Sequence, residues 1–153
     1  MKKKLLVLVA VGVTLVTGCS SKEGTLHCTI EKDIDSITKL ESIYNVDYKD
    51  GYATMLNTKE TITSDNKQVL ESYKSSLESM YSSYKNIKYY DNDIKVEDNK
   101  LISTTKVNYE KIDTDKLIEI DKNNKAAMEN GKVKVSILKE AYEQLGATCK
   151  EKK

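Results

Sequence analysis

The 153-residue chain contains no proline, tryptophan, phenylalanine or arginine, and its only histidine is His27. Arginine is the residue that proteins use most for bidentate recognition of phosphates and bases, so its absence argues against nucleic-acid binding. The absence of phenylalanine and tryptophan leaves ten tyrosines as the aromatic residues. We therefore expect most tyrosines to serve the hydrophobic core and its margins.

The scarcity of histidine also limits the catalytic chemistry. A Ser-His-Asp hydrolase needs a histidine base beside a nucleophile, but His27 lies next to Cys28 in an alternating segment without a nucleophile elbow. The sequence also has no glycine-rich phosphate loop. We therefore predict that the protein is not an enzyme and needs no cofactor, with a small hydrolase using paired carboxylates as an alternative.

The first 19 residues have the organisation of a bacterial lipoprotein signal. Three lysines follow Met1, residues 5–16 form an apolar run, and Thr17-Gly18 places small residues before Cys19. The run is shorter than the roughly 20 residues that a membrane span needs. This pattern predicts a signal peptide over residues 1–18, cleavage after Gly18, and a diacylglycerol group on the thiol of Cys19. Two or more acyl chains suffice for stable anchoring.

The predicted mature chain has a lipidated tether at residues 19–24 and one domain at residues 25–153. It carries 22 lysines against 24 acidic residues, so it has no excess of positive charge for a polyanion partner. We expect the protein on the extracytoplasmic face of a cell membrane. The abundance of lysine, asparagine, isoleucine and tyrosine suggests an AT-rich genome, as in Gram-positive bacteria of low GC content.

Two cysteines remain after lipidation of Cys19. An even pair in an extracytoplasmic domain favours one disulfide, here between Cys28 and Cys149. It would join the first strand to the C-terminal end of the chain. Two free thiols, or a metal site formed by this pair with His27, are the alternatives.

Hydrophobic periodicity predicts two hairpins. Leu26, Cys28 and Ile30 alternate with polar residues, which is typical of a strand. Residues 37–48 and 52–63 flank Asp50-Gly51, a strong hairpin signal. Residues 94–97 and 101–109 form a second predicted hairpin.

The remaining segments predict helices. Apolar residues recur at three- and four-residue steps over 65–85, with Ser64 as the expected cap. Asp113 starts a short helical turn, and residues 122–132 suit a loop or a frayed helix. A last helix is expected to begin at Ser136 and to end at Gly146. Together these elements predict an α+β fold, a mostly antiparallel sheet of about five strands with two helices packed on one face.

Several local strings resemble the YehR-like family of small bacterial lipoproteins. They are Tyr84-Lys85-Asn86-Ile87, the segment from Thr105 to Lys111, and the close from Leu138 to Gly146. Ala147 follows the final glycine, where such families often have phenylalanine. The resemblance implies a fold and a location in the cell envelope, and it provides no catalytic residue.

These observations lead to one functional hypothesis with two alternatives. The first is a non-enzymatic, lipid-anchored module that binds a small ligand or an envelope protein through the uncovered sheet face or the strand edges. Tyr48, Tyr52 and Tyr89 are the candidate contact residues. An apolar groove would support this hypothesis, and a wholly polar sheet face would count against it. The alternatives are the carboxylate hydrolase and a metal carrier using His27, Cys28 and Cys149.

Overall fold

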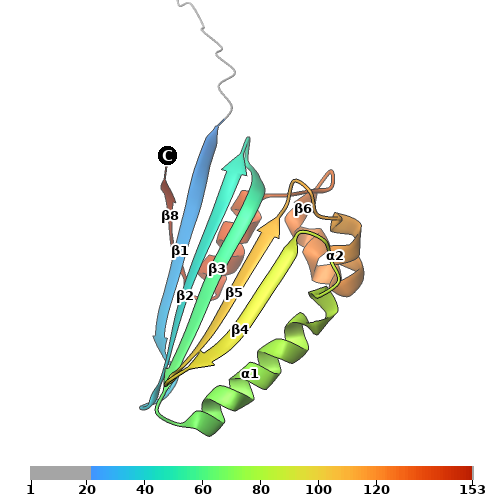
Figure 1. The fold of residues 1–153 in the computed structure, drawn as a ribbon. Coiled ribbons are helices and arrows are strands. Elements are labelled where there is room, and N and C mark those ends of the chain that lie inside the picture. The colour runs from blue at the N-terminus through green and yellow to red at the C-terminus, as the bar shows by residue number, and fades with distance from the viewer. Residues whose placement is uncertain (1–21, 153) are drawn as a thin grey trace, which may run out of the picture.

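A computed structural model describes residues 22–152 of the chain. It contains a six-stranded sheet with the strand order β4-β5-β3-β2-β1-β8, and every neighbouring pair is antiparallel (Figure 1). The predicted α+β fold is confirmed, with the C-terminal β8 as an additional strand. The six strands are β1 (Glu23–Asp33), β2 (Thr38–Lys49), β3 (Tyr52–Ser64), β4 (Tyr90–Glu97), β5 (Lys100–Asn108) and β8 (Thr148–Lys152).

The hairpin between β2 and β3 forms where the sequence predicts it. Asp50 and Gly51 both have positive φ angles, 52° and 84°. Such turns suit the right-handed twist of paired strands, and glycine adopts this conformation without steric cost. The predicted hairpin of β4 and β5 is also present, although β4 begins at Tyr90, four residues earlier than expected.

Helix α1 (Lys67–Tyr81) continues into a 3₁₀ turn, η1 (Ser82–Tyr84). The expected cap, Ser64, is wrong by two residues, because Ser64 is still paired with Thr38 as the last residue of β3. Asn66 caps the helix instead, and its side-chain oxygen accepts a hydrogen bond from the Gln68 amide at 3.0 Å. The helix therefore starts only after the chain has left the sheet.

The segment after β5 contains more structure than predicted. The helix α2 (Thr114–Ile120) is capped by Asp113 as expected, and a 3₁₀ helix, η2 (Lys122–Ala127), follows it. Instead of a loop, the chain then forms a two-stranded hairpin of β6 (Met128–Glu129) and β7 (Lys132–Val133).

Helix α3 (Val135–Gln144) begins before Ser136, so the prediction of Ser136 as its cap is wrong. Lys134 occupies the cap position because its amide is held by the Ala127 carbonyl and the Val135 amide by Gly51. Gly146, at a φ of 94°, ends the helical segment as predicted.

The disulfide predicted between Cys28 and Cys149 is present, and it joins directly opposite residues of β1 and β8. The helices lie on one side of the sheet, with α1 over β3, β4 and β5 and α3 over β1 and β8 (Figure 1). Within residues 22–152, no helix combines the length and the hydropathy that crossing a bilayer requires.

The covered face of the sheet holds two hydrophobic clusters. The large core cluster includes Leu26, Val46 and Val107, and the small core cluster consists of Ile62, Leu70 and Leu101 with partly buried neighbours. The strand register places a row of polar residues between them on β2, β3 and β5. We call this the polar row; its members, Ser42, Glu60 and Ser103, are directly opposite one another.

Candidate functional site

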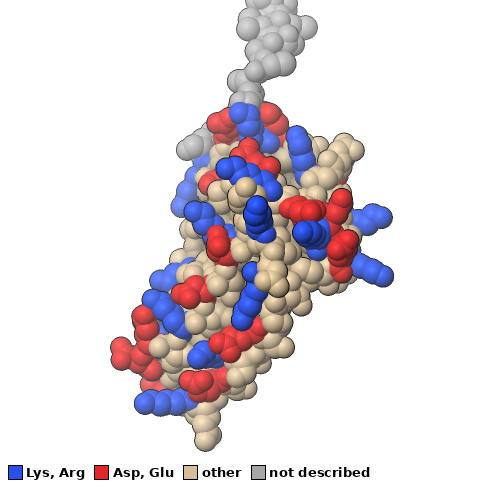
Figure 2. All heavy atoms as spheres, turned by 45° about the vertical axis from the view of Figure 1, so that its right-hand side comes forward, with Lys and Arg blue, Asp and Glu red and all other residues tan. Residues whose placement is uncertain are grey.

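The uncovered face of the sheet is polar. His27 Nδ1 lies 2.7 Å from Asn45 Oδ1, and the Thr25 hydroxyl donates to the Asp47 carboxylate at 2.7 Å. Among the described strand residues of this face, Ile43 is the large hydrophobic side chain with substantial exposure, 39%. Lysines and carboxylates alternate over the surface visible in Figure 2. This face therefore gives little support to the predicted binding surface.

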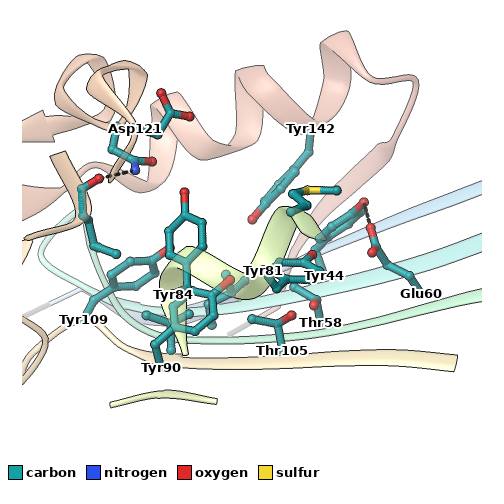
Figure 3. A pocket seen from close by; sticks show the side chains of 15 residues that line it. Tyr44, Thr58, Glu60, Tyr81, Tyr84, Tyr90, Thr105, Tyr109, Asp121 and Tyr142 are labelled. Atoms are coloured by element: carbon teal, nitrogen blue, oxygen red, sulfur yellow. Dashed lines mark hydrogen bonds between the residues drawn. The ribbon is translucent and has the colours of Figure 1, made fainter. Parts of the chain in front are cut away.

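A better candidate lies on the opposite side, between the sheet and the helices. A cavity of about 330 Å³ opens beside the polar row. This volume falls near the lower end of the range of roughly 300–1,000 Å³ typical of small-molecule sites. Six of the ten tyrosines line it and define what we call the tyrosine pocket (Figure 3): Tyr44, Tyr81, Tyr84, Tyr90, Tyr109 and Tyr142.

These tyrosines come from segments far apart in the chain. Tyr44 points inward from β2 and stacks on Tyr142 of α3, with ring centroids 4.3 Å apart and an interplanar angle of 18°. Tyr84 of η1 stacks on Tyr90 of β4 at 4.9 Å, and Tyr81 meets the same ring in a tilted arrangement at 6.5 Å. The two stacks give the pocket rigid aromatic walls that tie the helices to the sheet.

Glu60 provides the pocket with a carboxylate. Its side chain is half-buried on β3, and the Tyr44 hydroxyl donates a hydrogen bond to Glu60 Oε1 at 3.1 Å (Figure 3). Burial raises the pKa of Glu60, because removal from water disfavours the ionised form, and the Tyr44 hydrogen bond opposes this rise. No cationic side chain of the described residues forms a salt bridge with it.

Five of the six pocket tyrosines have a raised pKa and so stay protonated at neutral pH. Burial raises the pKa of both Tyr44 and Tyr109 to about 12, and it raises the pKa of Tyr81, Tyr90 and Tyr142 as well. For all of these except Tyr109, the negative charge of Glu60 adds to the rise. The pocket thus presents neutral phenol groups in a field that disfavours further negative charge.

A second carboxylate, Asp121, also lines the pocket but has a structural role. Asp121 Oδ1 accepts a hydrogen bond from the Asn123 amide at 2.9 Å and so caps η2. The nearby Asn124 side chain donates to the Leu117 carbonyl at 2.8 Å. Figure 3 shows Asp121 and Glu60 at opposite ends of the pocket, so they do not converge as a catalytic pair would.

Ser42 and Ser103 are the most buried members of the polar row, each with 1% of its surface exposed. The Ser42 hydroxyl has no hydrogen-bond partner among the described residues, although its proximity to Tyr44 lowers the pKa of that phenol. A buried hydroxyl without a partner typically costs about 1–3 kcal/mol. The polar row therefore weakens the core next to the tyrosine pocket.

Tyr48 and Tyr52, two of the predicted contact residues, lie outside the tyrosine pocket. The Tyr48 hydroxyl donates to Glu151 at 3.2 Å, and its ring passes so close to Gly24 that a Cβ there would lie 2.7 Å from the hydroxyl oxygen. The Tyr52 hydroxyl donates to Glu129 at 2.6 Å, beside a separate hollow of about 620 Å³. Each hydroxyl is thus engaged in joining strands at its own position.

Of the pair Tyr89-Tyr90, one side chain is exposed and the other lies in the tyrosine pocket, as expected for neighbouring residues that point to opposite sides. Tyr89 is 47% exposed, has a positive φ of 68°, and its ring faces Lys111 Nζ at 5.8 Å. Tyr90 turns into the tyrosine pocket. The structure therefore does not bring Tyr48, Tyr52 and Tyr89 together.

The sequence contains one indication of the pocket, but its spacing is the same as that of residues packed in the core. Tyr81 and Tyr84 extend the apolar stripe of α1 beyond Leu77, so their spacing matched that of core residues. Tyrosine in place of leucine at the end of the stripe, with a glutamate inside a strand, marks where the core stops being purely apolar.

Comparison with known proteins supports the fold. The chain matches no family model and no curated protein. It is similar to the NMR structure of the E. coli YehR protein, with a TM-score of 0.55 and 16% identity over 85% of this chain and 92% of that one. It is also similar to the NMR structure of a protein from Streptococcus pneumoniae TIGR4, with a TM-score of 0.50 and 12% identity over 98% and 99% of the two chains. The YehR-like fold implied by the sequence resemblance is confirmed.

Proposed function

We propose that this chain is a lipid-anchored binding protein on the extracytoplasmic face of a bacterial cell membrane, and that the tyrosine pocket holds a small ligand. The observation that carries this proposal is a cavity of about 330 Å³ that six tyrosines line together with the half-buried carboxylate of Glu60. Ligand sites typically combine aromatic walls with a few placed polar groups.

The proposed anchor rests on the sequence, because residues 1–21 lie outside the described part of the chain. Cys19 would carry the acyl chains, and β1 begins at Glu23, which leaves a short tether between the lipid and the domain. The disulfide between Cys28 and Cys149 suits an oxidising compartment.

Intact-mass measurement of the full chain extracted from membranes tests the anchor. We expect a mass that starts at Cys19 and includes diacylglycerol and further acyl chains. A Cys19→Ser variant is the control and should lose both the added mass and the lipid-dependent membrane retention. An unprocessed wild-type chain without acyl chains would contradict the anchor.

We propose binding rather than catalysis for two reasons. Asp121 caps a helix at the far end of the pocket from Glu60, which leaves one carboxylate available for chemistry. The two cysteine sulfur atoms of the suggested metal carrier are joined in the disulfide, so Cys28 and Cys149 are not free thiolate ligands for a metal beside His27.

The binding role is tested on the lipidated protein in detergent micelles with a library of small polar and charged metabolites. We expect at least one compound to shift the NMR signals of the tyrosine pocket. Tyr84→Ala should abolish that shift, whereas Tyr52→Ala, a matched change outside the pocket, should preserve it. Shifts confined to the hollow beside Tyr52, or no shift with any compound, would overturn the proposal.

A further inference from the structure

Resting on the proposed function, we infer that the ligand of the tyrosine pocket is a small organic cation that carries a quaternary ammonium group. The inference comes from the charges and the aromatic rings that the fold places in the lining of the cavity that also holds Glu60. A quaternary ammonium group donates no conventional hydrogen bonds, and proteins recognise it through aromatic rings and negative charge.

The charge of the lining is the first argument. Lysine makes up 25 of the 153 residues, yet none lines the pocket, whose two ionisable carboxyl groups belong to Glu60 and Asp121. The surface outside the pocket, in contrast, interleaves both signs (Figure 2). A lining that has carboxyl groups and no lysine gives the cavity a negative potential, which attracts cations and repels anions.

The state of Glu60 is the second argument. Its carboxylate is partly withdrawn from water and accepts a hydrogen bond from the neutral Tyr44 hydroxyl, and it has no salt bridge within residues 22–152. A buried charge without an opposite charge is unfavourable, so a bound cation would supply the missing compensation.

The aromatic walls are the third argument. Cation–π attraction acts when the cation lies within about 6 Å of a ring centroid and gains strength where water is excluded. The Tyr44–Tyr142 stack is adjacent to Glu60, and Tyr81 and Tyr84 line the same cavity (Figure 3). The tyrosine hydroxyls in the lining can form hydrogen bonds with a polar tail of the ligand.

A matched pair of probes tests the charge directly. Choline and its uncharged carbon isostere, 3,3-dimethylbutan-1-ol, have nearly the same shape, and methyl glucoside serves as a neutral, hydroxyl-rich probe. Isothermal titration of the lipidated protein, with NMR mapping, should show choline binding in the tyrosine pocket. Its affinity should exceed that of the isostere by about tenfold or more, as expected for a desolvated cation–π site.

Variants then assign the preference to residues. Glu60→Gln keeps the shape of the side chain and should reduce choline affinity about tenfold while leaving the binding of the isostere unchanged. Glu119→Gln changes an exposed glutamate of α2 outside the pocket and should leave both affinities unchanged. Thermal unfolding of each variant establishes that it is folded.

The outcomes separate this inference from the proposed function. Equal affinity for choline and the isostere, or preferential binding of methyl glucoside in the pocket, would overturn the cationic ligand and leave the binding role standing. If neither choline nor any library compound shifts the pocket signals, both fail.

Discussion

Helix α1 and the η1 turn that follows it cover two regions of the same sheet. One region is fully packed, and the other contains a cavity. The first half of α1 places Leu70, with no exposed surface, against Ile62 and Leu101 in the small core cluster. Its end and the following η1 place Tyr81 and Tyr84 over the next part of the same strands, where a cavity remains. The backbone arrangement is shared, so side-chain chemistry decides which region is sealed.

Two physical differences explain the contrast. Branched aliphatic side chains interdigitate to the density of an organic crystal, whereas a tyrosine ring is rigid and must keep its hydroxyl in contact with water or a partner. The polar row of Ser42, Glu60 and Ser103 supplies the second difference, because it replaces aliphatic residues on the floor beside the pocket. The packed core under α1 therefore ends at Glu60, where the cavity begins.

The largest expected effect concerns the disulfide, which joins β1 to β8 beside the large core cluster and lies outside the small core cluster. Replacing Cys28 and Cys149 together by alanine releases a link between residues 121 positions apart. We expect the free energy of unfolding to fall by about 2–5 kcal/mol, because the unfolded chain gains conformational freedom. Urea denaturation of oxidised wild type, reduced wild type and the double variant measures this. Equal stability of oxidised and reduced protein would contradict the prediction.

An effect of similar size is expected in the small core cluster. Leu70→Ala should lower the free energy of unfolding by about 2–5 kcal/mol, since it leaves a cavity among packed aliphatic groups. Leu145→Ala is the control, because Leu145 is 66% exposed and its loss should change stability by less than about 0.5 kcal/mol. At temperatures where Leu70→Ala is folded, ligand binding in the tyrosine pocket should persist. A loss of binding without unfolding would mean that the two regions are coupled.

The smallest effect is a gain in stability at Glu60. Burial places the folded-state pKa of Glu60 above its ordinary value of 4.5, so its contribution to stability is complete below pH 4.5 and is lost as pH rises through the raised pKa. Glu60→Gln removes the ionised form and should stabilise the unliganded protein at pH 7 by less than about 1 kcal/mol.

Urea denaturation at pH 4 and pH 7 checks the sign of this effect. The advantage of Glu60→Gln over wild type should shrink towards pH 4, where the carboxyl becomes protonated. The exposed Glu31 and Glu129 have lowered pKa values through Lys39 and Lys134, but they are the same in both proteins and cancel in the difference. A variant less stable than wild type at pH 7 would show that the hydrogen bond from Tyr44 matters more than the burial of charge.

The elements that the sequence predicted well depend on neighbouring residues. The turn at Asp50-Gly51 needs positive φ at two adjacent positions, and the stripe containing Leu70 needs regular helical spacing. Helix starts were predicted less well. Ser64 is a good capping residue in isolation, but sheet pairing with Thr38 holds it extended, so Asn66 caps α1.

The tyrosine pocket could not be predicted from local sequence patterns, because it depends on contacts between distant segments. Tyr44 and Tyr142 stack although they are separated by nearly the whole domain, and their contact exists only because α3 lies over the sheet. The same composition that predicted core tyrosines could not separate those that fill a core from those that border a cavity. Choosing Tyr48, Tyr52 and Tyr89 by sequence therefore led to residues at three separate places.

By itself, the sequence predicted the hairpins, the amphipathic stripe of α1 and the α+β class, and it favoured a disulfide between Cys28 and Cys149. These follow from local conformational preference, from the periodicity of burial and from counting. The tertiary structure alone decided that β8 completes the sheet, that the polar row interrupts the core, and that six tyrosines line one cavity together with Glu60. Those outcomes depend on which distant surfaces meet, and the free energy of that packing is shared among residues far apart in the chain.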